Sequence, residues 1–106
     1  MIKMKRAEIA EQYNKLVELT SVQLPAKAAV RLGEILDEMK IHISDFKKLK
    51  MELIKTYVDN HSQFNIEIIK LMNEDVEFKA RPIPETCLDD ISLTLAHARN
   101  LWMFVD

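Results

Sequence analysis

The sequence is poor in residues that cross-link a chain or interrupt regular structure. It has one cysteine, one glycine and three prolines among 106 residues. The single cysteine, Cys87, excludes a disulfide within the chain, and so few glycines and prolines argue against linkers and low-complexity segments. We therefore expect one helical domain that covers residues 1–106.

Long hydrophobic runs and a strong charge of either sign are also lacking. No stretch approaches the roughly 18 apolar residues of a membrane-spanning helix. The first residues carry charge without the apolar core of a signal peptide. The net charge of −2 and the isoelectric point of about 5.9 give no general attraction to nucleic acid or to a membrane surface. We therefore expect a cytoplasmic protein with no membrane partner, and nucleic acid is not favoured as a ligand.

One long amphipathic pattern, from Pro25 to about Val58, is the most prominent feature that the sequence does contain. Its apolar residues step by three and four, which predicts one continuous helix. Pro25 suits the first helical turn, where no backbone N–H is needed. A break near Gly33 or Ser44 is the alternative. The apolar stripe consists of Ala28, Leu32, Ile35, Met39, His42, Phe46, Leu49 and Leu53.

Such a helix is long for so small a chain. Thirty-odd helical residues span roughly 50 Å at ~1.5 Å each, whereas a compact domain of this size has a radius of gyration near ~13 Å. One copy can hardly cover the whole apolar face, so a second copy or another protein is its natural cover, and we expect a homo-oligomer, with a dimer favoured. The small residues Ala26, Ala29 and Gly33 are expected to let another backbone approach closely.

Shorter helical patterns flank the long one. Residues 3–20 predict a first helix that is antiparallel to the long helix. Residues 63–73 predict a third helix, with Asn60 or Ser62 as its N-cap. A last helix is predicted from residue 93 or 94 to the end. The expected fold is thus mainly α, with a long central helix and three shorter helices.

An extended or β segment is predicted near residues 76–83, where apolar and charged residues alternate. Val76, Phe78 and Ala80 point to one side, and two prolines follow. Four arrangements remain open for this segment. It can pair with residues 87–92, with its own copy in a dimer or with the sheet edge of a partner, or it can stay unpaired.

The order of several short motifs resembles a family of short phage- and prophage-encoded proteins from Gram-positive hosts, whose function is unknown. The resemblance covers roughly residues 20–105 and implies a small phage accessory protein in the cytoplasm of a bacterial host. Its motifs are packing and capping signals, so it implies no functional residue. The motifs are Leu24-Pro25-Ala26-Lys27, Phe64-Asn65-Ile66-Glu67, Leu71-Met72-Asn73-Glu74-Asp75-Val76-Glu77-Phe78 and Ser92-Leu93-Thr94-Leu95.

No residue set has the spacing of a catalytic, cofactor or metal site, so we expect no enzyme activity and no cofactor. His42 has only Glu38 as a possible second ligand one turn away, which favours a core or interface histidine over a metal ligand. Trp102, Met103 and Phe104 cannot all point inward from one helix, so at least one of them should face something other than the core, and interfaces favour such anchors. A terminal helix inserted between two others is the alternative. The predicted interaction residues are Met39, His42, Phe46, Leu49, Leu53, Phe78, Arg81, Trp102 and Phe104.

These patterns favour a non-enzymatic phage-type protein that self-associates and binds, or inhibits, a host or anti-phage-defence protein. One alternative is a sponge that holds a small molecule or nucleotide between subunits near Lys47, Lys48 or Arg81. The other alternative is a component of phage virion assembly or scaffolding.

Overall fold

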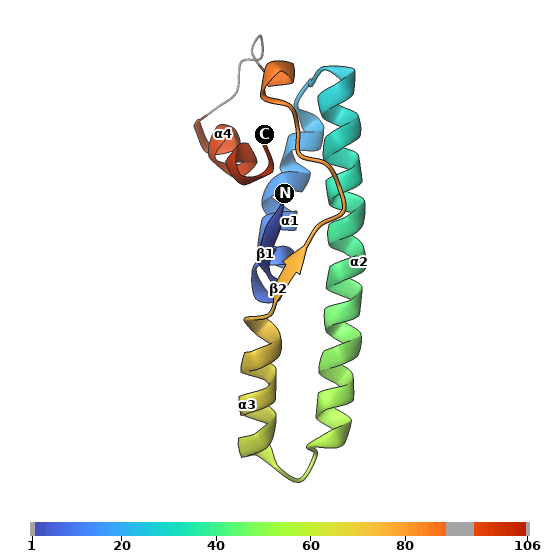
Figure 1. Ribbon diagram of the computed structural model, residues 1–106, viewed down its shortest axis with the longest axis vertical. Coiled ribbons are helices and arrows are strands. Elements are labelled where there is room, and N and C mark those ends of the chain that lie inside the picture. Colours follow the sequence, from blue (N-terminus) through green and yellow to red (C-terminus); the bar gives the residue numbers. More distant parts are fainter. Residues whose placement is uncertain (1, 89–94, 106) are drawn as a thin grey trace.

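The computed structural model describes residues 2–88 and 95–105, and it is mainly α-helical, as predicted. Within these residues, four α-helices, two short strands and three 3₁₀ turns follow one another (Figure 1). The helices are α1 (Arg6–Val17), α2 (Ala26–Thr56), α3 (His61–Met72) and α4 (Leu95–Leu101). The strands are β1 (Lys3–Lys5) and β2 (Asp75–Glu77), and the 3₁₀ turns are η1 (Glu18–Ser21), η2 (Glu85–Leu88) and η3 (Trp102–Phe104).

Helix α2 is one unbroken helix of 31 residues, which confirms the predicted continuous helix. Pro25 precedes it with a φ of −54°, and its carbonyl accepts the first helical hydrogen bond from the backbone N–H of Ala29. Proline fixes φ near this value, so it starts the helix without strain. At ~1.5 Å per residue, α2 is roughly 46 Å long, and it gives the molecule its longest extent of 56 Å.

The other helices lie along α2 rather than around it. Figure 1 shows α1 beside the N-terminal half of α2 and α3 beside its C-terminal half, with the two strands where α1 and α3 meet. Helix α4 packs on α1. The molecule is therefore a rod of 56 × 24 × 22 Å with a radius of gyration of 16.5 Å, larger than the ~13 Å of a compact domain of this length.

The extended segment after α3 is paired, but with a strand that the sequence analysis did not predict. Strand β2 is antiparallel to β1, with Met4 opposite Val76. None of the four arrangements left open included this partner. Within the predicted extended or β segment 76–83, regular strand pairing ends at Glu77, after which the backbone N–H of Phe78 donates to the carbonyl of Ile2 at 2.8 Å. Farther along, Ile83 forms one parallel bridge with Val105.

An ion pair and a backbone hydrogen bond support the short sheet where it meets α1 and α3. The guanidinium of Arg6 lies 3.0 Å from the carboxylate of Glu74, and the backbone N–H of Arg6 donates to the carbonyl of Glu74 at 3.0 Å.

The first helix was predicted over residues 3–20, but α1 begins three residues later, at Arg6, because Lys3–Lys5 form a strand. The predicted last helix began at 93 or 94, which lies outside the described residues.

The hydrophobic core lies around the N-terminal half of α2. The last buried residue of α2 is Met39, and no residue of α3 is buried. In the described parts of the chain, the buried apolar residues are Ile2, Met4, Ile9, Leu16, Leu19, Ala28, Leu32, Ile35, Leu36, Met39, Val76, Phe78, Ile83, Leu101 and Phe104. The rod thus has a cored end, which we call the body, and an end without a core.

The close approach of another backbone expected at Gly33 is not found within one copy of the chain. A Cβ built on Gly33 would meet no atom within 4 Å, so no neighbouring backbone approaches the helix there. The side of α2 that carries the small residues Ala29 and Gly33 instead lines a hollow of about 180 Å³, which η1 and the loop after it close from the other side.

Candidate interaction surface

The coreless end is an antiparallel helical hairpin, and we call it the arm (residues 41–72). It consists of the C-terminal part of α2, a short turn and α3. The turn is closed by local hydrogen bonds: the backbone N–H of Asn60 donates to the carbonyl of Tyr57, and the side-chain Oδ1 of Asn60 accepts from the backbone N–H of Gln63 at 3.1 Å. Asn60 is thus the N-cap of α3, one of the two residues predicted for it.

The apolar stripe of α2 continues into the arm, where α1 reaches only its first residues and α3 covers the rest. Phe46, Leu49 and Leu53 are half-buried there, whereas Leu32 and Ile35 of the same stripe are buried in the body. The α3 residues that are half-buried include Phe64, Ile68 and Leu71. The contact between the two helices is therefore a single apolar seam that stays open to solvent on both sides.

Large apolar side chains gather on the outer surface of the arm. Val58 is 63% exposed and Ile69 is 57% exposed. Contiguous exposed apolar surface on a small protein is typical of interaction sites. The exposed large apolar residues of the arm are Ile41, Met51, Ile54, Val58, Ile66, Ile69 and Met72.

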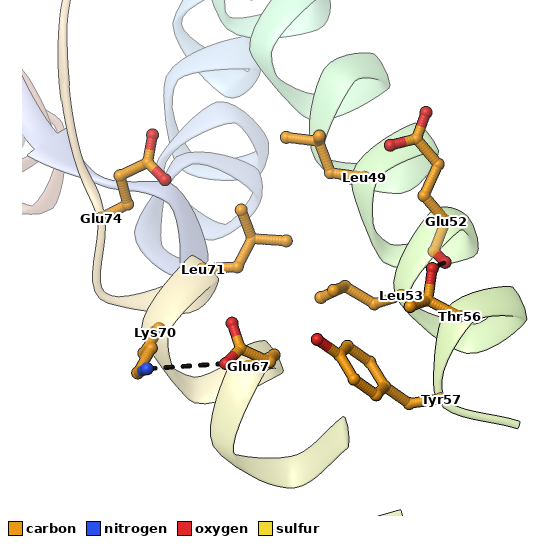
Figure 2. Close-up of a pocket in the computed structure, with 9 residues that line it drawn as sticks. All are labelled: Leu49, Glu52, Leu53, Thr56, Tyr57, Glu67, Lys70, Leu71 and Glu74. Carbon is orange, nitrogen blue, oxygen red and sulfur yellow. Dashed lines mark hydrogen bonds and ion pairs between the residues drawn. The ribbon is translucent and has the colours of Figure 1, made fainter. Parts of the chain in front are cut away.

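An open groove of about 560 Å³ runs along one side of the seam (Figure 2). Figure 2 shows Leu49, Leu53 and Leu71 directed toward the space between the helices, and the Tyr57 hydroxyl directed across it toward α3. Thr56 lies at its rim, where its hydroxyl donates to the carbonyl of Glu52 at 2.8 Å. The groove thus has an apolar floor.

The charges at the edge of the groove are mostly negative. Glu52, Glu67 and Glu74 line it together with one cation, Lys70, which lies 3.5 Å from the Glu67 carboxylate. Glu74 forms an ion pair with Arg6, whereas Glu52 has no ion-pair partner among residues 2–88 and 95–105. An unpaired carboxylate beside an apolar floor suits a ligand that has both apolar and cationic groups.

The carboxylate of Glu38 fastens the segment after β2 to α2. It accepts hydrogen bonds from the backbone N–H groups of Lys79 at 2.9 Å and Ala80 at 2.7 Å. His42 Nε2 lies 3.0 Å from the same carboxylate, and its ring contacts Phe78 with a centroid distance of 5.0 Å. Burial raises the pKa of Glu38, but the hydrogen bonds from His42, Lys79 and Ala80 and the charge of His42 outweigh burial and hold this pKa below its usual value.

The predicted interaction residues fall into different environments. Met39, Phe78 and Phe104 are buried in the core, so they contact no partner in this conformation. His42 is half-buried at the border of body and arm, where it holds the segment after β2. Phe46, Leu49 and Leu53 are the only predicted residues in the seam of the arm.

The two remaining predicted residues lie on the surface of the body. The guanidinium of Arg81 lies 3.5 Å from the Glu34 carboxylate. Trp102 is 82% exposed, whereas Phe104 of the same 3₁₀ turn is fully buried. The expectation that at least one of these C-terminal side chains points away from the core is confirmed for Trp102.

Several groove residues were missed by the sequence analysis, although a signal for them exists. Glu38, Asp45 and Glu52 are seven residues apart, so they lie in one row along α2. Glu67 and Glu74 repeat the same spacing across the end of α3. Of these carboxylates, Glu52, Glu67 and Glu74 line the groove, and none of the three is among the interaction residues predicted from the sequence.

The cations proposed for a nucleotide site do not converge within one copy of the chain. Lys47 lies thirteen residues, or roughly 20 Å, along α2 from Glu34, the ion-pair partner of Arg81. Within residues 2–88 and 95–105, no three His, Cys, Asp or Glu side chains are close enough to hold a metal ion. None of the described helices has the length and apolar character needed to cross a membrane.

Comparisons of the chain with protein-family models, with curated proteins and with solved structures give no match. The resemblance to phage proteins therefore remains a prediction.

Proposed function

We propose that this chain is a non-enzymatic interaction protein that self-associates through the arm. The observation that carries the proposal is the contrast within one helix: α2 has buried residues as far as Met39 and none in the arm, where α3 also has none. The arm nevertheless keeps a continuous apolar seam and seven exposed large apolar side chains.

A second copy would supply the missing layer. Two helices bury only the strip where they touch, whereas helical bundles enclose a core between three or four helices. These side chains are 39–63% exposed, so burying the remainder of each contributes roughly half of the ~1.5–3 kcal/mol of a fully exposed one, and most of the seven are needed to offset the cost of association. Burial of the arm's apolar side chains against a second copy therefore favours oligomerisation over an arm exposed to solvent.

The second part of the proposal concerns a partner protein. We infer that the assembled protein binds, or inhibits, a host or anti-phage-defence protein in a bacterial cytoplasm, the setting implied by the resemblance to phage proteins. Trp102 supports a contact outside the arm, because a tryptophan that is 82% exposed is a common anchor of protein interfaces. Since Trp102 lies in the body, this contact would leave the arm free for self-association.

Analytical ultracentrifugation tests the self-association. The wild-type chain is expected to sediment with an average mass above 12.4 kDa that rises with concentration. Ile69→Ser in the arm should lower this mass. Val30→Ser is the matched control, because Val30 is 59% exposed on α2 but lies in the body, so it should change nothing. A wild-type chain that stays monomeric at every concentration would refute the proposal.

Affinity capture from a bacterial host tests the second part. Wild-type protein and Trp102→Ala, both shown to be folded and assembled, are used as bait in parallel. A host protein that is retained by the wild type and lost with Trp102→Ala supports the proposal. Equal capture by both baits would remove Trp102 from the interface.

A further inference from the structure

The two open sides of the arm carry opposite charges. Successive helical residues are separated by about 100°, so residues two positions apart lie on nearly opposite sides of a helix. Glu52 lies at the groove and Ile54 is two positions away; likewise Glu67 lies at the groove and Ile69 is two positions away. Ile54 and Ile69 therefore belong to the side of the arm that faces away from the groove.

We call this second side the lysine face, and it carries lysines and exposed apolar residues. Lys50 lies two positions before Glu52, and Lys47 lies two positions after Asp45 of the acidic row. Lys47 also lines a hollow of about 410 Å³ between α1 and α2, on the side away from the groove. The lysine face consists of Lys47, Lys50 and Ile54 on α2 and of Ile69 and Met72 on α3.

The groove matches this face in both polarity and charge. It offers an apolar floor and three carboxylates, of which Glu67 is paired with Lys70 and Glu74 with Arg6, so that Glu52 carries the negative charge left without a partner in the described chain. The lysine face offers Ile54, Ile69 and Met72, all exposed, with two lysines beside them. The free carboxylate of Glu52 is positioned for one of these cations.

We propose that the arm associates head to tail, with the groove of one copy holding the lysine face of the next copy. The inference rests on the self-association proposed above and specifies how it occurs. Contact between two grooves would bring carboxylates against carboxylates, and contact between two lysine faces would bring lysines together. Like charges at an interface oppose association, so the charge pattern disfavours both symmetric pairings and favours the asymmetric one.

A head-to-tail contact leaves one groove and one lysine face free at the ends of every assembly. Such contacts produce rings if the rotation closes and open chains if it does not. Wild-type protein should therefore grow beyond a dimer as its concentration rises. Added salt should shorten the assemblies, because it screens the contacts between lysines and carboxylates.

Two variants, each with one disabled face, test the proposal. Glu52→Lys with Glu67→Lys reverses the charge of the groove, and Ile54→Ser with Ile69→Ser removes the apolar residues of the lysine face. All four positions lie on the surface or the edge of the seam, and circular dichroism checks that both variants keep their helices. Each variant alone should be monomeric, with association weakened roughly tenfold or more.

Mixing the two variants gives the decisive measurement. The mixture keeps one intact groove and one intact lysine face, so sedimentation should show a 1:1 pair that does not grow further. Glu18→Lys with Glu85→Lys places the same charge change on the body and should assemble like the wild type.

Other outcomes separate this inference from the function on which it rests. A wild type that stops at a dimer, or a mixture that stays monomeric while the wild type assembles, refutes the head-to-tail contact and leaves self-association in place. Normal assembly by the groove variant likewise refutes the role of the groove. A monomeric wild type refutes both proposals.

Discussion

The body and the arm share one helix, but their packing differs. In the body, α2 is covered by α1, η1 and the segment after β2, and Ile35 and Met39 have no exposed surface. In the arm, α1 reaches only the first residues of α2, and Leu49 and Leu53 farther along face α3 and stay half-exposed. The comparison shows that an apolar stripe becomes a core only where a third element closes over it.

The same substitution at two points of α2 should give the largest difference between body and arm. Leu32→Ala in the body should lower the free energy of unfolding by about 2–5 kcal/mol, because it leaves a cavity in a packed core. Leu53→Ala in the arm should cost only about 1 kcal/mol, because that side chain is already half in solvent. Urea denaturation at low protein concentration measures both. Equal costs would show that Leu53 is packed as tightly as Leu32 within one copy, and would contradict the division into body and arm.

A smaller effect is expected at Glu38, where body and arm join. Glu38→Gln should destabilise the protein by about 1–2 kcal/mol at neutral pH, since it removes charged hydrogen bonds to Lys79 and Ala80. Glu34→Gln is the control, because Glu34 is more exposed and its contact with Arg81 is long at 3.5 Å; it should cost less than about 0.5 kcal/mol.

The loss of unfolding free energy caused by Glu38→Gln should become smaller as the pH falls. The pKa of Glu38 is lower in the folded protein than its ordinary value of 4.5. The unfolded chain therefore takes up the proton first, and the stabilisation by Glu38 is complete above pH 4.5 and is lost as the pH falls through the folded pKa. The difference between wild type and Glu38→Gln should shrink over this range. A difference that grows on acidification would contradict the assignment.

The smallest effect is expected at Gly33, on the body half of α2. Gly33→Ala should stabilise the protein by up to about 1 kcal/mol, because alanine favours a helix and its Cβ would meet nothing within 4 Å. Thermal unfolding followed by circular dichroism measures the change. Destabilisation that appears only at high protein concentration would instead indicate that another copy packs against this point.

Much of the fold could be predicted because its signals are local. Pro25 and the regular apolar steps defined α2, and Asn60 as an N-cap defined the start of α3. The partner of β2 could not be predicted in this way. Lys3–Lys5 is too short to show an alternation, and its pairing with Asp75–Glu77 is a tertiary contact between distant segments.

The interaction surface was predicted less well than the fold. The stripe is equally apolar at Met39 and Leu53, and only the neighbouring elements decide that Met39 is buried. Phe78 and Phe104 were predicted to lie in an interface, but both are buried in the core. Their core neighbours come from distant parts of the chain, so the local sequence does not indicate this burial. The groove needs both helices of the arm, so no single segment indicates it, and of the heptad-spaced carboxylates on α2 only Glu52 lines it.

The pairing of Met4 with Val76 also has a consequence for the order of folding during synthesis. The arm joins neighbouring segments and can form as soon as both of its helices leave the ribosome. Strand β1 must wait until residues 75–77 have been translated, because its partner does not exist before then. The apolar surface of the arm is therefore exposed on the nascent chain before the body is complete. During this period, association between neighbouring nascent chains competes with folding.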